Sequence, residues 1–170
     1  MSAAGAFEPA TGDGPTPAAP NGPNGPNGPD RPDGRPGSGG ARAAEVRTAY
    51  EGLLQIRRLV NGAAGETVPA PWERQQPERA VALALKAAGL PPSAVDPATG
   101  ARTAMGYVVG PGEAPGQVRV AWAGPPGGGT AGQEQERLTA CAGVLGQLGW
   151  ECLLYRGPKH RRYLEVEPPR

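Results

Sequence analysis

Apolar residues recur at intervals of three and four positions between residues 43 and 60, which predicts an amphipathic helix. Asn61-Gly62 supplies a stop signal directly after this stretch. Arg47, Arg57 and Arg58 lie on or near the flanks of the apolar stripe, where we expect a solvated face. The apolar positions of the stripe are Val46, Ala49, Tyr50, Leu53, Ile56 and Val60.

Two further helices are indicated by the same periodicity. Pro77 can open one at its first turn, and Gly89 ends it before Pro91-Pro92. The other covers about residues 133–148, with Gly149 after it. Its apolar stripe is Leu138, Cys141, Val144, Leu145 and Leu148. Residues 90–104 lie between the two helices and have the composition of a loop, so we expect no regular structure there.

Strand patterns occupy the C-terminal part of the chain. Residues 106–109 and 117–123 predict two strands, and in the second Val118, Val120 and Trp122 alternate with smaller or polar residues. Residues 150–155 and 162–166 predict a hairpin that turns around Gly157-Pro158. The predicted fold class is therefore α+β: two N-terminal helices, then a β-β-α-β-β unit forming a small antiparallel sheet with helices packed on one face.

The first forty residues differ from the rest. Residues 1–40 hold ten Gly and nine Pro, include three consecutive Asn-Gly-Pro units, and offer only Met1 and Phe7 as large apolar side chains. Such a segment cannot bury enough surface to offset the entropy of ordering its backbone. We expect a disordered tail over 1–40 and one domain over 41–170, with a helical part at 41–90 and the β-β-α-β-β part at 104–168.

Net charge, hydropathy and cysteine content bear on the compartment and the partners of the protein. The formal net charge is +1, which argues neither for nor against a polyanionic partner. No basic-then-apolar leader and no apolar run of membrane-spanning length is present, and the two cysteines lack a disulfide framework. We therefore expect a cytoplasmic protein with no membrane partner. Arg outnumbers Lys fifteen to two, a bias typical of bacterial genomes rich in G and C.

The sequence predicts no catalytic, cofactor-binding or metal-binding residues, and no small-molecule substrate. The glycine-rich stretch from Gly124 to Thr130 has the spacing of a phosphate loop but lacks its lysine. A single histidine and two cysteines cannot complete a zinc site. Glu165 and Glu167 share one face of the last strand, where a solvated outer face explains them more simply than paired catalytic carboxylates.

The remaining feature is a basic hairpin turn between Tyr155 and Tyr163. A β-ribbon tip that carries cations beside aromatic rings can contact a phosphate backbone, whereas a charged turn also simply keeps a hairpin soluble. The candidate nucleic-acid contacts are Arg156, Lys159, His160, Arg161 and Arg162.

We interpret the chain as a non-enzymatic cytosolic accessory or regulatory interaction protein whose partner is a protein, a second copy or a nucleic acid. Three alternatives remain. A DNA-binding regulator would cluster Arg57, Arg58 and Arg119 with the hairpin 156–162. A protein-binding adaptor would dock or dimerise through an uncovered apolar face of helix 43–60. An enzyme with an unrecognised site would need a deep pocket lined by polar groups.

Overall fold

The computed structural model describes residues 8–14 and 38–170. Four strands form its main sheet: β3 (Gly106–Pro111), β4 (Val118–Ala123), β5 (Glu151–Arg156) and β6 (Arg162–Glu167). The sheet is antiparallel throughout, with the spatial order β3-β4-β6-β5. Helix α4 (Thr130–Gln147) connects β4 to β5, so the last strand of the chain lies between the two strands that α4 joins.

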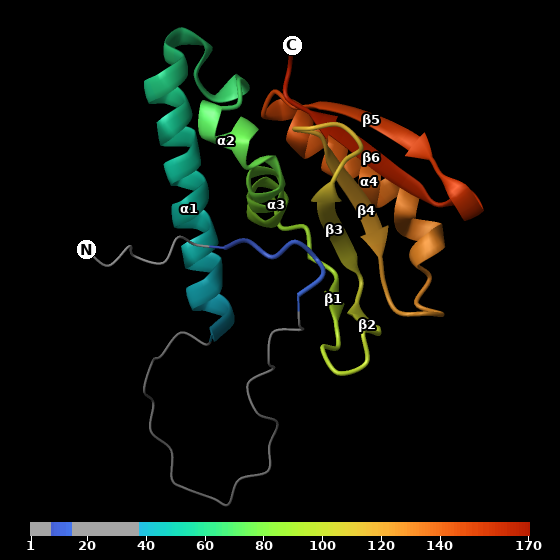
Figure 1. Ribbon diagram of the computed structural model, residues 1–170. Coiled ribbons are helices and arrows are strands. Elements are labelled where there is room, and N and C mark those ends of the chain that lie inside the picture. The colour runs from blue at the N-terminus through green and yellow to red at the C-terminus, as the bar shows by residue number, and fades with distance from the viewer. Residues whose placement is uncertain (1–7, 15–37) are drawn as a thin grey trace, which may run out of the picture.

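One face of this sheet is covered by helices α3 (Pro77–Ala87) and α4, and no helix of the described residues packs on the other (Figure 1). The covered face is built by alternation: Val118, Val120 and Trp122 of β4 are buried, as are Leu164 and Val166 of β6. Leu138, Cys141 and Leu145 of α4 complete the core against them. We call the opposite, helix-free side the open face.

Helix α1 (Ser38–Asn61) forms a third layer, packed on the side of α3 away from the sheet (Figure 1). Val46 and Leu53 of α1 meet Leu83 of α3 in a small second core. The 3-10 segment Gly62–Thr67 and helix α2 (Pro71–Gln75) return the chain from α1 to α3. No helix among the described residues is both long and apolar enough to cross a bilayer.

The α+β class predicted from the sequence is confirmed. Two details differ from the expected elements. Strands β1 (Ala94–Val95) and β2 (Arg102–Ala104) form a separate two-stranded sheet within the stretch predicted as loop. Helix α2 was also not expected, because five residues are too few for a helical periodicity to show.

Residues 8–14 form a strap along the outer edge of β3, although they were predicted to belong to a disordered tail. Thr11 O accepts the Val109 amide at 2.7 Å, and Gly14 O accepts the Val95 amide at 3.0 Å. Gly12 has φ +98°, and a Cβ there would lie 2.1 Å from Tyr107 O, so only glycine fits this approach. Residues 38–40 of the predicted tail are the first residues of α1, and the remainder of the tail, 1–7 and 15–37, lies outside the described residues.

Arg57 is completely buried, so its expected place on a solvated flank was wrong. Its guanidinium donates to both carboxylate oxygens of Glu73 at 2.7 Å and to the carbonyl oxygens of Glu66 and Leu148 at 2.6 Å. A buried charge is tolerated only when it is paired and hydrogen-bonded in this way. The pair fixes α1 to α2 and to the end of α4, and it turns Ile56 and Val60 outward, where they are exposed.

Candidate interaction surface at the open edge of the sheet

Strand β5 is the outermost strand of the sheet, and three consecutive apolar side chains on it face solvent. Leu153, Leu154 and Tyr155 are 58%, 43% and 41% exposed. Leu153 and Tyr155 pair with β6 residues of the open face, whereas Leu154 lies opposite buried Leu164 and so belongs to the helix-covered face. The strand therefore presents apolar groups on both of its faces.

The backbone of β5 presents hydrogen-bonding groups along the same edge. The Gly157 amide donates to Arg161 O at 2.7 Å, so it points toward the β6 side of the hairpin. Backbone groups alternate in direction along a strand, so those of Cys152, Leu154 and Arg156 point away from β6. Within residues 8–14 and 38–170, no segment pairs with β5 on that side.

The outer edge of β3 has the same kind of groups, but they are paired. The same alternation, carried across the sheet, points Tyr107 and Val109 outward. Tyr107 N donates to Pro91 O at 3.0 Å, Tyr107 O accepts the Ser93 amide at 2.9 Å, and Val109 N donates to Thr11 O of the strap. One edge of the sheet is thus covered by the chain itself, and the other is open.

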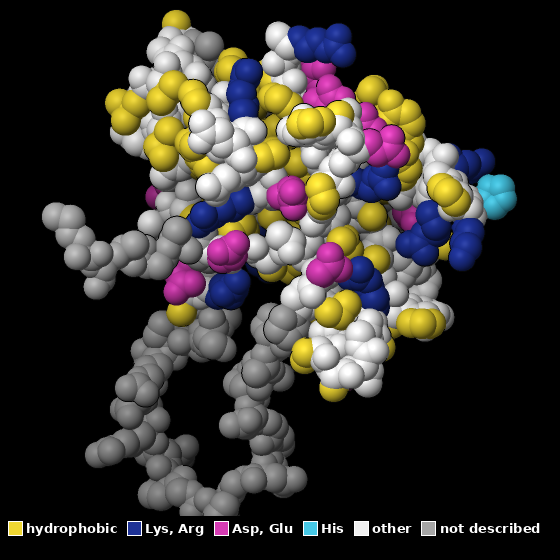
Figure 2. All heavy atoms as spheres, viewed as in Figure 1, with side chains coloured by type: hydrophobic (Ala, Val, Ile, Leu, Met, Phe, Trp, Pro, Cys, Tyr) yellow, Lys and Arg dark blue, Asp and Glu magenta, His cyan; other side chains and the backbone are white. Residues whose placement is uncertain are grey.

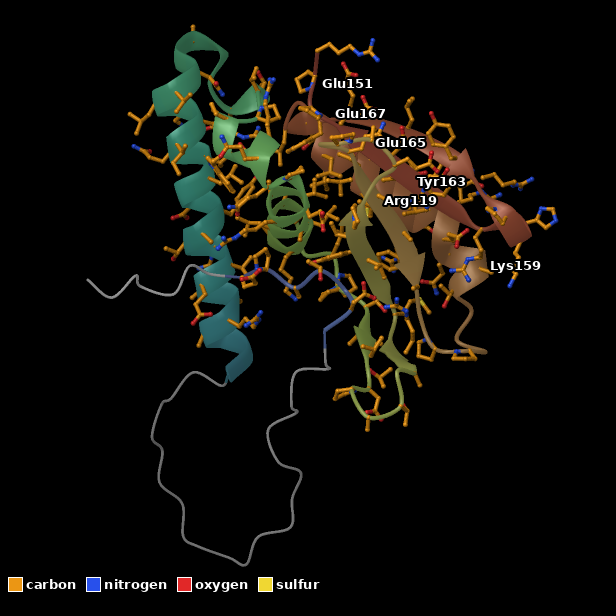
Figure 3. All side chains as sticks on the ribbon, viewed as in Figure 1. Arg119, Glu151, Lys159, Tyr163, Glu165 and Glu167 are labelled. Atoms are coloured by element: carbon orange, nitrogen blue, oxygen red, sulfur yellow. The ribbon has the colours of Figure 1, made fainter. Side chains whose placement is uncertain are left out.

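Aromatic and charged side chains line the open face next to β5 (Figure 3). The guanidinium carbon of Arg119 lies 4.2 Å from the centre of the Tyr163 ring, and this ring stacks on Tyr155 at a centroid distance of 5.7 Å. At the other end of the face the amide nitrogen of Gln117 donates to the carboxylates of Glu165 and Glu167. Gln117 therefore bridges the two carboxylates that share this face of β6.

Opposite charges occupy the two ends of the β5–β6 hairpin. Glu151, Glu165 and Glu167, here called the acidic end, lie at the start of β5 and the end of β6. Figure 3 shows Glu151 and Glu167 far from Lys159, which lies at the turn. The turn is the predicted basic hairpin, here called the basic tip, and Figure 2 shows Lys and Arg side chains gathered around the histidine there. Its members are Arg156, Lys159, His160, Arg161 and Arg162.

The five predicted residues of the basic tip do not all have the same role. Arg156, Lys159 and His160 are exposed, and the last two adopt left-handed backbone angles, φ +57° and +58°. Arg161 instead holds the tip onto the fold: its Nε donates to Glu134 at 2.8 Å and its Nη2 to Trp122 O at 3.0 Å. The Arg162 amide donates to the other oxygen of Glu134 at 2.6 Å.

Glu134 of α4 braces the basic tip, and the sequence reasoning did not single it out. Its side chain is 2% exposed and lies under the tip. The available signal was weak: an acidic residue in the first helical turn, 27 positions before an arginine of a turn. Either residue is commonplace alone, and only the crossing of α4 over the sheet brings them together.

The arginines of α1 do not join the basic tip. Arg57 is buried against Glu73, and exposed Arg58 is paired with Glu66. Arg119 lies on the open face over Tyr163. The clustering that the DNA-binding alternative requires is therefore limited to the tip itself. The adaptor alternative finds an uncovered apolar group at the end of α1, where Ile56, Leu59 and Val60 are 40%, 76% and 54% exposed.

The two cysteines and one cavity bear on the enzyme alternative. Burial raises the pKa of Cys141 to about 12 and that of Cys152 to about 11, which disfavours the nucleophilic thiolate at neutral pH. A cavity of about 520 Å³ lies beside the strap, and its lining combines alanine and proline residues with the charged side chains of Glu8, Arg42 and Lys86. Among residues 8–14 and 38–170, no group of three or more His, Cys, Asp or Glu side chains is placed to hold a metal ion.

Comparison of the chain with protein-family models, with curated proteins and with solved structures finds no match.

Proposed function

We propose that the protein is a non-enzymatic accessory or regulatory interaction protein that binds an extended polypeptide as an added strand along β5. The observation that carries this proposal is the open edge: outward backbone groups at Cys152, Leu154 and Arg156, flanked by exposed apolar side chains on both faces of the strand. The two cysteines are unpaired, which supports a reducing compartment such as the cytoplasm.

Strand addition needs only what this edge offers. The main chain of a bound segment supplies hydrogen bonds, and its alternate side chains meet the two faces of the acceptor strand. Leu153 and Tyr155 would meet one set of the partner's side chains, and Leu154 the other. An exposed edge of this kind is ordinarily interrupted by a charge, a proline or a bulge, and residues 152–155 contain none of these.

A peptide-display selection on the full chain, held at low surface density, tests the proposal. Leu154→Pro is the blocking variant, because it removes an outward amide without breaking a bond to β6. We expect selected peptides to bind the native chain, to protect the amides of Cys152, Leu154 and Arg156 from hydrogen exchange, and to lose binding to Leu154→Pro. Peptides that bind both chains equally, without that protection, would contradict the proposal.

A second candidate is contact with a nucleic-acid backbone through the basic tip. Three exposed cationic or titratable side chains, Arg156, Lys159 and His160, gather on one turn and favour it. Fluorescence anisotropy of labelled duplex and single-stranded DNA over a salt series tests it, with Arg156→Ala/Lys159→Ala as the variant. Arg161 is left intact, because it braces Glu134. Binding that weakens with salt, and has a shallower slope in the variant, is the expected result. Absence of binding at low salt would reject it.

A further inference from the structure

Strand β5 is complementary to itself when two copies are placed antiparallel. We propose that the open edge binds the β5 strand of a second copy, around a two-fold axis that passes through Leu154 perpendicular to the sheet. Two four-stranded sheets then form one continuous sheet, with the helices of both copies on the same side. This inference rests on the proposed function, since it names the polypeptide that occupies the same edge.

The backbone determines the register. Cys152, Leu154 and Arg156 carry the outward groups, and an antiparallel pair bonds only where such residues oppose one another. Placing Leu154 opposite Leu154 of the second copy also places Cys152 opposite Arg156, so all three outward residues are bonded. A shift that centres the pair on Leu153 leaves Arg156 opposite Trp150, which lies before the strand begins.

The same register gives every exposed apolar side chain of β5 an apolar neighbour. Leu154 meets its own copy on the helix-covered side. On the open face Leu153 of each copy lies opposite Tyr155 of the other, extending the stacked pair of Tyr155 and Tyr163 across the boundary. Side-chain contacts between directly opposite residues stabilise a pair of neighbouring strands. In the shifted register Tyr155 would instead face Glu151.

Charge favours the antiparallel direction. β5 begins at the acidic end and finishes at the basic tip. In the proposed pair Glu151 of one copy lies opposite Gly157 of the other, at the start of the turn that carries Lys159. Both ends of the interface then join opposite charges, whereas a parallel pair would align like with like. The β3 edge cannot form a similar pair, because the strap and residues 91–93 occupy it.

Sedimentation velocity of the full chain over a concentration series measures the association. Glu151→Lys and Lys159→Glu should each weaken the dimer about threefold or more, since each places like charges together at both ends of the interface. An equimolar mixture of the two variants should recover association, because each supplies the charge that the other needs. Recovery in the mixture also shows that both single variants are folded. A mixture as weak as the single variants would overturn the proposal.

Disulfide cross-linking tests the register in a Cys152→Ser background. Leu154→Cys lies opposite itself and should form a covalent dimer under mild oxidation, whereas Leu153→Cys, which faces Tyr155, should not. The reverse pattern would overturn the register. A native chain that stays monomeric at every concentration would overturn the second copy as partner. The peptide selection then separates the two proposals: peptide binding at β5 retains strand addition with a different chain, and its absence rejects both.

Discussion

The two edges of the sheet differ in how their backbone groups are satisfied. At β3 three outward backbone groups, the amides of Tyr107 and Val109 and the carbonyl of Tyr107, have partners in residues 91–93 or in the strap. At β5 the described chain supplies none, and the side chains there are apolar. The β3 edge is covered by the strap, a segment far away in the sequence, and this contact needs a glycine at position 12 where the two backbones lie close together. This contrast is the basis for the proposed partner strand at β5.

The largest loss of stability is expected from Gly12→Ala, which should uncover the β3 edge and so remove the difference between the two edges. The new Cβ would lie 2.1 Å from Tyr107 O at a φ that L residues avoid, so the strap must shift or detach. We expect a loss of about 1–3 kcal/mol in the free energy of unfolding. Chemical denaturation measures this loss, and faster hydrogen exchange of the Val109 amide locates it.

Gly14→Ala is the matched control, because nothing lies within 4 Å of a Cβ at that position. It should leave both the free energy of unfolding and the Val109 amide unchanged. Equal effects of the two substitutions would mean that the strap does not depend on the close approach at Gly12.

The helices and strands with a clear local hydrophobic pattern were predicted from the sequence. The contacts between residues far apart in the sequence were not. The alternation in β4 and the glycine stops after α1 and α3 suffice to predict those elements. The strap could not be predicted, because a Gly/Pro-rich composition indicates disorder unless a distant β3 edge accepts it. The burial of Arg57 could not be predicted, because its neighbour Ile56 fits the apolar stripe and would be expected to be the buried side chain. Only the position of Glu73, distant in the sequence, decides which of the two is buried.

The candidate site was predicted in part. The basic tip was identified from five residues close together in the sequence, but Arg161 proved to be a brace, which depends on Glu134 of α4. The open β5 edge was not foreseen. The residues Glu151 to Arg156 predict a strand equally well at the centre or the edge of a sheet, because strand order follows from the crossover through α4 and not from local sequence.

A smaller effect on stability is expected at the open edge from Arg161→Ala, which should loosen the hairpin that presents β5. Glu134 would keep its bond to the Arg162 amide but lose its charged partner. We expect about 1–2 kcal/mol of destabilisation, reduced from the cost at a fully buried pair because Arg161 is half exposed. Arg162→Ala, which keeps the backbone amide, should cost less by thermal or chemical unfolding. The opposite order would remove Arg161 from its assigned role.

The stability of the protein at alkaline pH depends on one weakly acidic side chain of each edge strand, the Tyr107 hydroxyl on β3 and the Cys152 thiol on β5. Burial raises the pKa of Tyr107 on β3 and raises that of Cys152 on β5 to about 11. The unfolded chain ionises its cysteines first, so the folded state should lose stability progressively as pH rises above about 9. Cys152→Ser should reduce this loss between pH 9 and 11, as followed by urea unfolding at several pH values. An unchanged slope would mean that Cys152 ionises equally easily in both states.

The smallest effect on the free energy of unfolding is expected from Leu154→Lys, within about 0.5 kcal/mol because the position is exposed. Its effect on association should nevertheless be large, since a lysine on an edge strand opposes pairing with another strand. Sedimentation measured beside chemical denaturation separates the two quantities. A strong loss of stability would show that Leu154 serves the fold and not an interface.

The strap also has a consequence for the order in which the molecule is completed during synthesis. The hydroxyl of Tyr107 donates a hydrogen bond to the carbonyl oxygen of Ala10, and Tyr107 is translated 97 positions after Ala10. At ordinary rates that interval is roughly 5–20 seconds. β4 pairs with β6 in the finished sheet, so its second edge stays unpaired until β6 has been synthesised. A nascent chain therefore exposes more strand edge than the finished protein, and closure of the β3 edge is a late event in its biogenesis.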